Sequence, residues 1–310
     1  MRISLTFIIT GLLFFMTSCT VTSSKEVSKI KIELSIQTNQ ENKEKIIELL
    51  LKDQTKFLVN FDEQNSYNLE DDVLSSNLKY FCRSLLEDER RVIENAIFKD
   101  KKSEDKKVLI VYSKKYEDIA SELRNKYPNQ IYFAINMSNY EKQIKDILNV
   151  DMSLNRNNRL SKLDKSIQIL HTPRIRNDII GIYFLTDYDA GKTIVPIFKS
   201  YTLDTKFYSS TEIFHDASNF KKLFDFENTL VPITNKMLGE IYDKNRISIK
   251  SEIETILIKD FLMIEKIHQN NLFRDEIIPL TGNLKIKRNG CLDRNLGLWK
   301  VSTVNIKNQI

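Results

Sequence analysis

Two short, almost wholly apolar runs constrain the fold of this chain more than any other feature of its sequence. They are Val108–Tyr112 and Asp178–Leu185, and the second, DIIGIYFL, is the stronger. A half-exposed strand alternates apolar and polar residues, whereas a continuous apolar run of this length is typical of a strand buried on both faces. Such strands occur in parallel sheets that helices cover on both sides. The two runs therefore predict the centre of a parallel sheet.

The other segments alternate between strand-like and helix-like patterns. These patterns predict strands at 30–36, 56–61, 130–135 and 207–209 with a weaker one at 77–84, and helices at 42–52, 87–98, 116–127, 140–150 and 252–270. Strands that alternate with helices favour an α/β fold with a largely parallel sheet. The all-polar stretch between Phe98 and Lys107 is the expected hinge between two lobes.

Glycine is scarce, and its distribution excludes the common nucleotide-binding signatures. The chain has 7 glycines, and none lies between Thr20 and Ile180. Neither GxGxxG nor GxxxxGKS/T occurs, so the loops that let backbone N–H groups close on a phosphate are missing. The formal net charge of +5 is mild, with 47 basic and 42 acidic residues mixed along the chain. This mixture predicts solvated faces and no nucleic-acid groove.

The N-terminus has the features of a secretory signal. Arg2 precedes the apolar run Ile3–Met16, which is too short to cross a bilayer because a spanning helix needs roughly 20 apolar residues. The segment Met16–Cys19, MTSC, resembles the lipobox of bacterial lipoproteins, in which the cysteine thiol receives a diacylglycerol and becomes the new N-terminus. The departure from the pattern is Met16, where Leu is usual. The alternative is an ordinary signal peptide with an incidental cysteine, or an uncleaved anchor.

The predicted mature chain begins at Cys19 and is tethered by the small, polar residues 19–28. Removing residues 1–18 leaves 310 − 18 = 292 residues, enough for one large or two small domains. In many Gram-negative lipoproteins, an Asp directly after the lipidated cysteine resembles a signal for retention in the inner membrane. Thr20 in that place favours the outer membrane, with the chain facing the periplasm.

Two further cysteines, Cys82 and Cys291, remain in the predicted mature chain. A disulfide between them is possible in an oxidising compartment. Nothing in their spacing requires one, and we expect two separate buried thiols.

Several segments of the second half occur in a characteristic order. They are 144–160, 173–185, 194–196, 206–213, 280–284 and 289–299, and the last contains the only Trp of the chain. Their order and spacing resemble the C-terminal domain of the LppC/LpoA family, lipoproteins that activate penicillin-binding protein 1A. The clear similarity covers roughly Val108–Val301, and a weaker one reaches back to Phe81–Glu94.

The resemblance implies a two-lobed fold of the type I periplasmic binding proteins, with two α/β lobes of which the first is reduced. With the hinge expected between Phe98 and Lys107, we assign the reduced first lobe to 29–106 and the second lobe, with a C-terminal crossover segment, to 107–310. The family pattern includes a long N-terminal helical-repeat domain, for which this chain has no room. The segment Val231–Thr234 also lacks the Trp of the family. Partner contacts made by the missing parts therefore cannot be carried over.

Five residues are candidate partner or structural contacts. Arg174, Arg176 and Asp178 precede the strongest strand and point to one side of an extended stretch. Two guanidinium groups can grip a carboxylate on a partner or ligand, but we favour an internal pair between Asp178 and one of the arginines. Arg294 and Trp299 lie in the closing segment, where we expect Trp299 to pack in the core or between the lobes.

No residue set predicts catalysis or metal binding. The three histidines, His171, His215 and His268, lie far apart in the sequence, whereas a zinc site needs three or four suitable ligands. We therefore expect no metal and no cofactor. The chain also lacks the GxSxG motif of a nucleophile elbow, so Ser209 and Ser210, close to His215, are expected to be surface-loop residues.

Acidic residues at a predicted helix start have a simpler explanation than catalysis. Glu87, Asp88 and Glu89 lie where a helix dipole attracts carboxylates. We therefore expect a protein that is not an enzyme.

Two functions remain open. The resemblance implies an envelope lipoprotein that binds a class A penicillin-binding protein, a peptidoglycan synthase, and activates it. The alternative is a periplasmic lipoprotein that binds a small ligand such as an amino acid or a muropeptide, because two-lobed folds of this kind often close on solutes.

Overall fold

The computed structural model describes residues 32–52, 57–61, 67–69, 72–98, 106–136, 138–163, 175–202, 204–242, 248–269 and 276–303. The predicted signal, Cys19 and the tether lie outside these residues, as do Arg174 and His171. Within the described ranges, no helix is long and apolar enough to cross a membrane.

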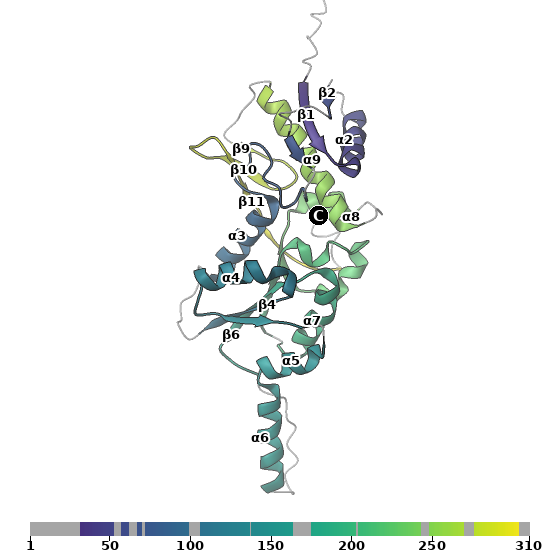
Figure 1. Ribbon diagram of the computed structural model, residues 1–310. Helices are drawn as coiled ribbons and strands as arrows, with labels where there is room; N and C mark the ends of the chain where they lie inside the picture. The colour runs from purple at the N-terminus through teal and green to yellow at the C-terminus, as the bar shows by residue number, and fades with distance from the viewer. Residues whose placement is uncertain are drawn as a thin grey trace, which may run out of the picture.

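A six-stranded sheet forms the centre of the larger lobe (Figure 1). In spatial order its strands are β12 (Leu298–Lys300), β8 (Thr229–Pro232), β7 (Lys206–Ser209), β6 (Ile179–Leu185), β4 (Lys107–Tyr112) and β5 (Ile131–Ala134). Every neighbouring pair is parallel except β12 and β8. The two apolar runs form β4 and β6, which pair with each other. The predicted α/β fold with a largely parallel sheet is confirmed.

Helices cover both faces of this sheet, and β4 shows how the sequence produces this arrangement. Val108 and Ile110 pack in one apolar cluster, while Leu109 and Val111 pack in another, because successive side chains of a strand point to opposite faces. The first cluster includes residues of α3 (Leu85–Phe98) and α4 (Glu117–Lys126). The second includes residues of α5 (Tyr140–Ile147) and α7 (Tyr188–Tyr201), a helix that we did not predict.

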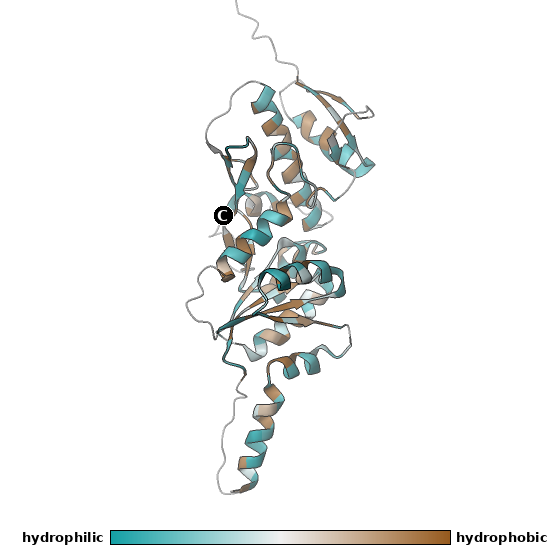
Figure 2. Cartoon of the chain, turned by 60° about the vertical axis from the view of Figure 1, so that its left-hand side comes forward, coloured by the Kyte–Doolittle hydropathy of each residue, from teal (hydrophilic) through white to brown (hydrophobic). Residues whose placement is uncertain are grey.

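Helix α6 (Val150–Leu163) projects from the end of the larger lobe, away from the remaining elements (Figure 1). The predicted helix at 140–150 is interrupted because Asn149 adopts the left-handed conformation, with φ of 59°. Val150 is the buried residue of α6, and Arg156 and Arg159 are exposed. Figure 2 shows hydrophobic and hydrophilic residues mixed along this helix.

The smaller lobe contains a parallel sheet of three strands in the order β2 (Phe57–Asn60), β1 (Ile32–Thr38) and β3 (Tyr67–Leu69). Helix α2 (Gln40–Lys52) follows β1, and α9 (Ile249–Gln269) contacts both α2 and β1 (Figure 1). A helix from the second half of the sequence therefore contributes to the smaller lobe. The division of the chain at 106/107 stays a prediction.

The strand predicted at 77–84 is wrong. Tyr80 has a positive φ of 72°, which a strand does not accommodate, and Phe81 forms only an isolated bridge to Leu292. The apolar residues of this segment, Leu78 and Phe81, are buried. Their apolar character reflects a loop packed into the core and not a strand in a ladder.

The expectation of two separate thiols is also wrong. Cys82 and Cys291 form a disulfide across a sequence separation of 209, with Cα atoms 5.1 Å apart. The bond joins the 77–84 loop to an antiparallel sheet of β9 (Glu276–Ile277), β10 (Asn283–Ile286) and β11 (Leu292–Asn295). Backbone bonds bring the partners together, since Cys82 N–H donates to Leu292 O at 2.9 Å.

Candidate functional site

Arg294 on β11 lies in the interior of the protein. Its side chain is 1% exposed, and its Nη1 donates to Asp88 Oδ2 at 2.9 Å. Its Nε donates to Thr281 Oγ1 at 3.1 Å, and its guanidinium carbon lies 4.4 Å from the centroid of the Phe81 ring. Burial lowers the pKa of Arg294 and raises that of Asp88, and the attraction between the two charges opposes both shifts. This sequence candidate has only internal partners.

Further charges surround the pair. Asp88 also accepts from Arg83 Nε at 2.8 Å and lies 3.4 Å from Arg91 Nη2. Asp293 pairs with Arg83, and with Lys287 at 2.8 Å. Although burial alone would raise the pKa of Asp293, Lys287, Arg91 and Arg83 hold it below its usual value. The start of α3 is thereby joined to β11.

Helix α9 is joined to the same region through Asp260. Its carboxylate accepts the backbone N–H groups of Leu280 at 2.9 Å and Thr281 at 2.7 Å. The hydroxyl of Thr281 in turn accepts from Arg294. Three elements far apart in the sequence, α3, α9 and β11, thus share one buried polar network.

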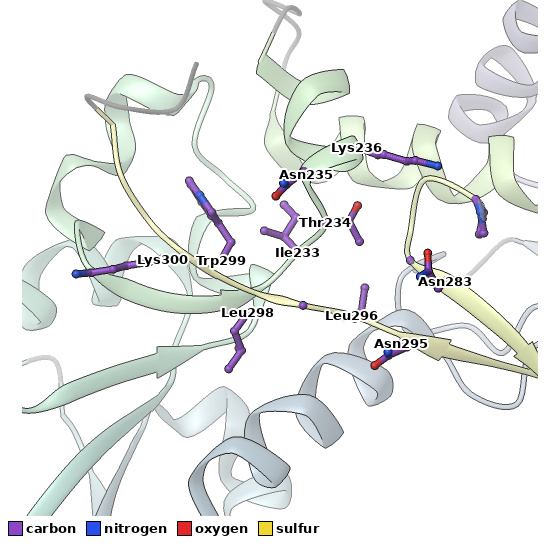
Figure 3. A pocket seen from close by; sticks show the side chains of 13 residues that line it. Ile233, Thr234, Asn235, Lys236, Asn283, Asn295, Leu296, Leu298, Trp299 and Lys300 are labelled. Carbon is purple, nitrogen blue, oxygen red and sulfur yellow. The ribbon is translucent and has the colours of Figure 1, made fainter. Parts of the chain in front are cut away.

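A groove lies next to this network, where the chain crosses from β11 to β12. We call it the crossover groove; it is lined by Ile233, Thr234, Asn235, Lys236, Pro279, Gly282, Asn283, Asn295, Leu296, Gly297, Leu298, Trp299 and Lys300, with a volume of about 610 Å³ (Figure 3). Trp299 is 6% exposed, and its ring meets that of Phe220 edge to face at 6.1 Å. Among the described residues that line the groove are two Lys and three Asn, and none of them is acidic. The crossover groove is our candidate functional site.

The wall of the groove is held at the start of α8 (Asn235–Tyr242). Thr234 Oγ1 accepts the backbone N–H of Met237 at 3.1 Å, as a helix-capping residue does, and donates to Leu280 O at 2.6 Å. Lys236 Nζ donates to Ile278 O at 3.2 Å. Both bonds connect α8 to the 278–283 turn on the other side of the groove.

Arg176 and Asp178 lie elsewhere, before the amino end of β6. Arg176 Nε donates to Asp178 Oδ1 at 3.0 Å and its Nη2 to Oδ2 at 2.6 Å. The pair lowers the pKa of Asp178 and raises that of Arg176. This geometry matches the internal pair that we favoured, and the role of these residues as partner contacts stays a prediction.

The three acidic residues at the start of α3 have three different roles. Glu87 completes a capping box with Ser84, in which the carboxylate accepts Ser84 N–H at 2.9 Å and Glu87 N–H donates to the serine hydroxyl at 3.3 Å. Asp88 belongs to the buried network. Glu89 is fully buried and accepts Thr211 N–H at 2.8 Å, with the Thr211 hydroxyl at 2.9 Å. The helix dipole alone therefore does not explain the three acidic residues at the start of α3.

Burial shifts the pKa values of Glu89 and His215, which both lie beside Thr211. It raises the pKa of Glu89 to about 8, against the hydrogen bonds from Thr211, and lowers the pKa of His215 to about 3. His215 Nε2 lies 3.3 Å from Thr211 Oγ1.

The expectation that Ser209 and Ser210 are surface-loop residues is wrong, because both are buried. The hydroxyl of Ser209 donates to Phe184 O at 2.9 Å. Among the described residues, no group of His, Cys, Asp and Glu could hold a metal ion.

These shifts predict how stability depends on pH. The folded pKa of Glu89, about 8, exceeds its ordinary value of 4.5. Its contribution to the unfolding free energy is therefore lost as pH rises from 4.5 through 8. The folded pKa of His215, about 3, is below 6.5, so its contribution is lost as pH falls below 6.5. In the folded protein Glu89 titrates towards the upper end of the range from pH 6.5 to 8. There the unfolding free energy should fall by about 1.5 kcal/mol.

Urea unfolding at pH 6.5 and 8 measures this difference. Glu89→Gln should remove the part of the decline that Glu89 causes, because the amide does not ionise. Glu87→Gln, which removes an exposed carboxylate two residues earlier, should leave it in place. An equal decline in wild type and Glu89→Gln would contradict the assignment to Glu89.

Comparison with solved structures identifies the fold. The chain is similar to a putative branched-chain amino acid ABC transporter from Chromobacterium violaceum, with a TM-score of 0.54 and 10% identity, over 87% of this chain and 99% of that one. The fold is that of a type I periplasmic binding protein. Among the described residues, the sheet of the smaller lobe has three strands and that of the larger lobe has six, which agrees with the predicted reduction of the first lobe.

LpoA from Haemophilus influenzae is also among the similar structures, as the sequence predicted. Its C-domain, described as a regulator of PBP1A, has a TM-score of 0.43 and 10% identity over 87% of this chain and 80% of that one. For full-length LpoA the TM-score is 0.44 and the identity 11%, over 87% of this chain and 46% of LpoA. The chain thus spans about half the length of full-length LpoA. No protein-family model and no curated protein matches the sequence.

Proposed function

We propose that this chain is an envelope lipoprotein that binds a class A penicillin-binding protein and raises its activity without catalysing a reaction itself. The sequence resemblance to the LppC/LpoA family over 108–301 suggests this class of partner. The Haemophilus influenzae C-domain is described as a regulator of PBP1A. A regulator acts by binding one state of its target more tightly than another, so it needs a stable surface and no reactive groups.

The observation that carries this proposal is the way the two lobes are joined. One cluster of buried apolar side chains extends from Ile32 and Leu34 in β1 to Phe184 in β6. Helix α9 contacts β1 and α2 on one side and α8 and the 211–214 turn on the other. A receptor that closes on a solute needs lobes that hinge or slide against each other. A shared core instead suits a rigid body that presents its outer surface.

The carboxyl edge of the larger sheet supports the same conclusion. Ligands of open parallel sheets bind beyond the carboxyl ends of the strands. Here Glu89 of α3 binds Thr211, which follows β7, and Thr186, which follows β6, is 1% exposed. Protein atoms therefore occupy positions where a solute would lie.

Binding to a purified class A penicillin-binding protein tests the proposal. We expect the soluble chain from Ser23 onward to bind with micromolar or better affinity and to speed glycan polymerisation or peptide cross-linking. A class B penicillin-binding protein, which lacks the glycan-polymerising domain, is the control partner. The activator function is excluded if no binding occurs at roughly 10 µM, a concentration that detects interactions of about −7 kcal/mol.

The same proposal places the chain on the outer membrane through lipid on Cys19, facing the periplasm. The support is the MTSC segment after a short apolar run, with Thr20 in the next position. Several acyl chains hold a protein firmly, whereas one binds reversibly. Labelled palmitate should enter the full-length chain and not the Cys19→Ala variant, and only the former should sediment with membranes. Equal sedimentation of both would contradict the lipid anchor.

The second candidate, a small-ligand receptor, is favoured by the similarity to the Chromobacterium violaceum protein, described as a putative branched-chain amino acid transporter. The test that separates the two is a thermal-shift series with amino acids, peptides and muropeptides. A saturable increase in Tm with one of these, together with no binding of the synthase, would select the receptor.

A further inference from the structure

Strand β12 lies at the edge of the six-stranded sheet, and no strand of the described part of the chain pairs with its outer side. Gly297 O accepts Ile233 N–H at 3.1 Å, and Val301 N–H donates to Thr229 O at 2.8 Å. Because alternate residues of an antiparallel strand bond to the neighbour, the backbone groups of Leu298 and Lys300 point away from β8. Among the described residues, none bonds to them. Unpaired edge groups are a template for an added strand.

The crossover groove runs along the segment that contains this edge. Six consecutive residues, 295–300, line it. An extended segment of this length spans roughly 20 Å at about 3.3 Å per residue. In Figure 3, Asn235 and Thr234 lie on one side of the segment and Asn295 on the other. A groove lined by six consecutive residues, with the amide groups of Asn235 and Asn295 on two sides of them, suits an extended peptide better than a compact solute.

The charge of the lining indicates which peptide fits. Lys236 and Lys300 line the groove, and none of its described lining residues is Asp or Glu. Helix α8 also begins there at Asn235, and the first turn of a helix favours negative charge. Lys300 lies on this edge, and a lysine on an edge strand disfavours pairing with a second copy of the same edge. Charge therefore favours an acidic segment from a different protein.

We propose that the crossover groove binds an extended acidic segment of a partner protein, which adds to β12 as a further strand and places its carboxylates near Lys236 and Lys300. Backbone bonds to Leu298 and Lys300 supply affinity in this mode of recognition, and side-chain contacts supply selectivity. The inference deepens the proposed partner binding and rests on it for the identity of the partner.

Trp299 is the only Trp of the chain and lines the groove, so its fluorescence reports on occupancy. The probe is the peptide acetyl-TETDTET-amide, added to the full chain in detergent at low salt. We expect a saturable change in Trp299 emission that salt weakens. The uncharged acetyl-TQTNTQT-amide should cause a much smaller change. The inference is overturned if the acidic peptide has no effect up to roughly 1 mM, if both peptides bind equally, or if a disaccharide-tetrapeptide muropeptide binds in their place.

Substitutions separate the charge from the backbone contribution. Lys236→Glu and Lys300→Glu should each weaken binding of the acidic peptide about fivefold to tenfold. Lys206→Glu, at an exposed position on β7 outside the groove, should leave binding unchanged. Leu298→Pro removes the outward N–H, which an edge strand tolerates, and should abolish binding, whereas Leu298→Ala should retain it. Equal affinity in Lys300→Glu and Lys206→Glu would refute the role of the groove.

The outcomes also separate this inference from the proposed function. If the synthase binds the chain but neither the peptide nor the lysine variants have an effect, only the groove assignment fails. If the acidic peptide binds as described and the synthase does not bind, only the proposed partner fails.

Discussion

Replacement of Arg294 by Met should lower the unfolding free energy by about 3–5 kcal/mol, the range for removing one partner of a buried ion pair. Arg294 and Asp88 are each 1% exposed and 2.9 Å apart. Without the guanidinium, the carboxylate of Asp88 stays in the interior with only Arg83 and Arg91, whose side chains are partly exposed. The hydroxyl of Thr281 also loses its donor. Methionine preserves most of the apolar volume, so the loss reports the charge and not a cavity.

Two further variants identify the cause of this loss. Arg83→Met removes a partner of Asp88 that is 33% exposed, and it should cost about 1 kcal/mol or less because water replaces an exposed charge easily. Asp88→Asn combined with Arg294→Met should recover part of the loss, since both buried charges are then absent. Urea unfolding of the oxidised protein measures all four chains. An Arg294→Met protein within about 1 kcal/mol of wild type would show that the pair contributes little.

The position of this network explains why its loss should also affect the groove. Leu280 directly precedes Thr281, and its carbonyl oxygen accepts a hydrogen bond from Thr234 at the start of α8. Asn295 follows Arg294 directly, and both Asn295 and Gly282 line the groove. The buried charges thus hold the two walls of the candidate site.

The sequence predicts the larger lobe well because its signals are local. The apolar runs at β4 and β6 need no partner to be recognised, and the helices that cover them follow the usual spacing of apolar residues. The 77–84 loop misleads because Leu78 and Phe81 are apolar for packing reasons, while the left-handed Tyr80 leaves no local signal. Strands β9 to β12 have two to four residues each, too few for a pattern to develop.

The candidate site is predicted only in part, because it is assembled from distant segments. Trp299 stood out as the single Trp, and the family resemblance drew attention to 231–234 and 280–284. The sequence gives no reason to group Asn235 with Asn283 and Asn295. These side chains line one groove only because the chain crosses back to β8. Glu89 was grouped with its acidic neighbours, because nothing local shows that Thr211, 122 residues later, covers it. Interactions between such distant residues depend on the fold and not on the local pattern.

Reduction of the Cys82–Cys291 disulfide should destabilise the protein by about 2–4 kcal/mol, the typical effect of losing such a bond. The cysteines are 209 residues apart, so the bond closes a loop that contains the whole larger sheet except β12. In the chain-entropy account, a loop of this length restricts the unfolded chain strongly. The folded geometry should persist after reduction, because Leu292 N–H still donates to Tyr80 O at 2.6 Å and Arg83 still pairs with Asp293.

Urea unfolding with and without dithiothreitol measures the effect of the disulfide on the unfolding free energy. Cys82→Ala, Cys291→Ala and the double variant should be equally destabilised and insensitive to the reductant, since each loses the same bond. Two free thiols in the native oxidised protein, or identical unfolding of wild type with and without reductant, would contradict this prediction.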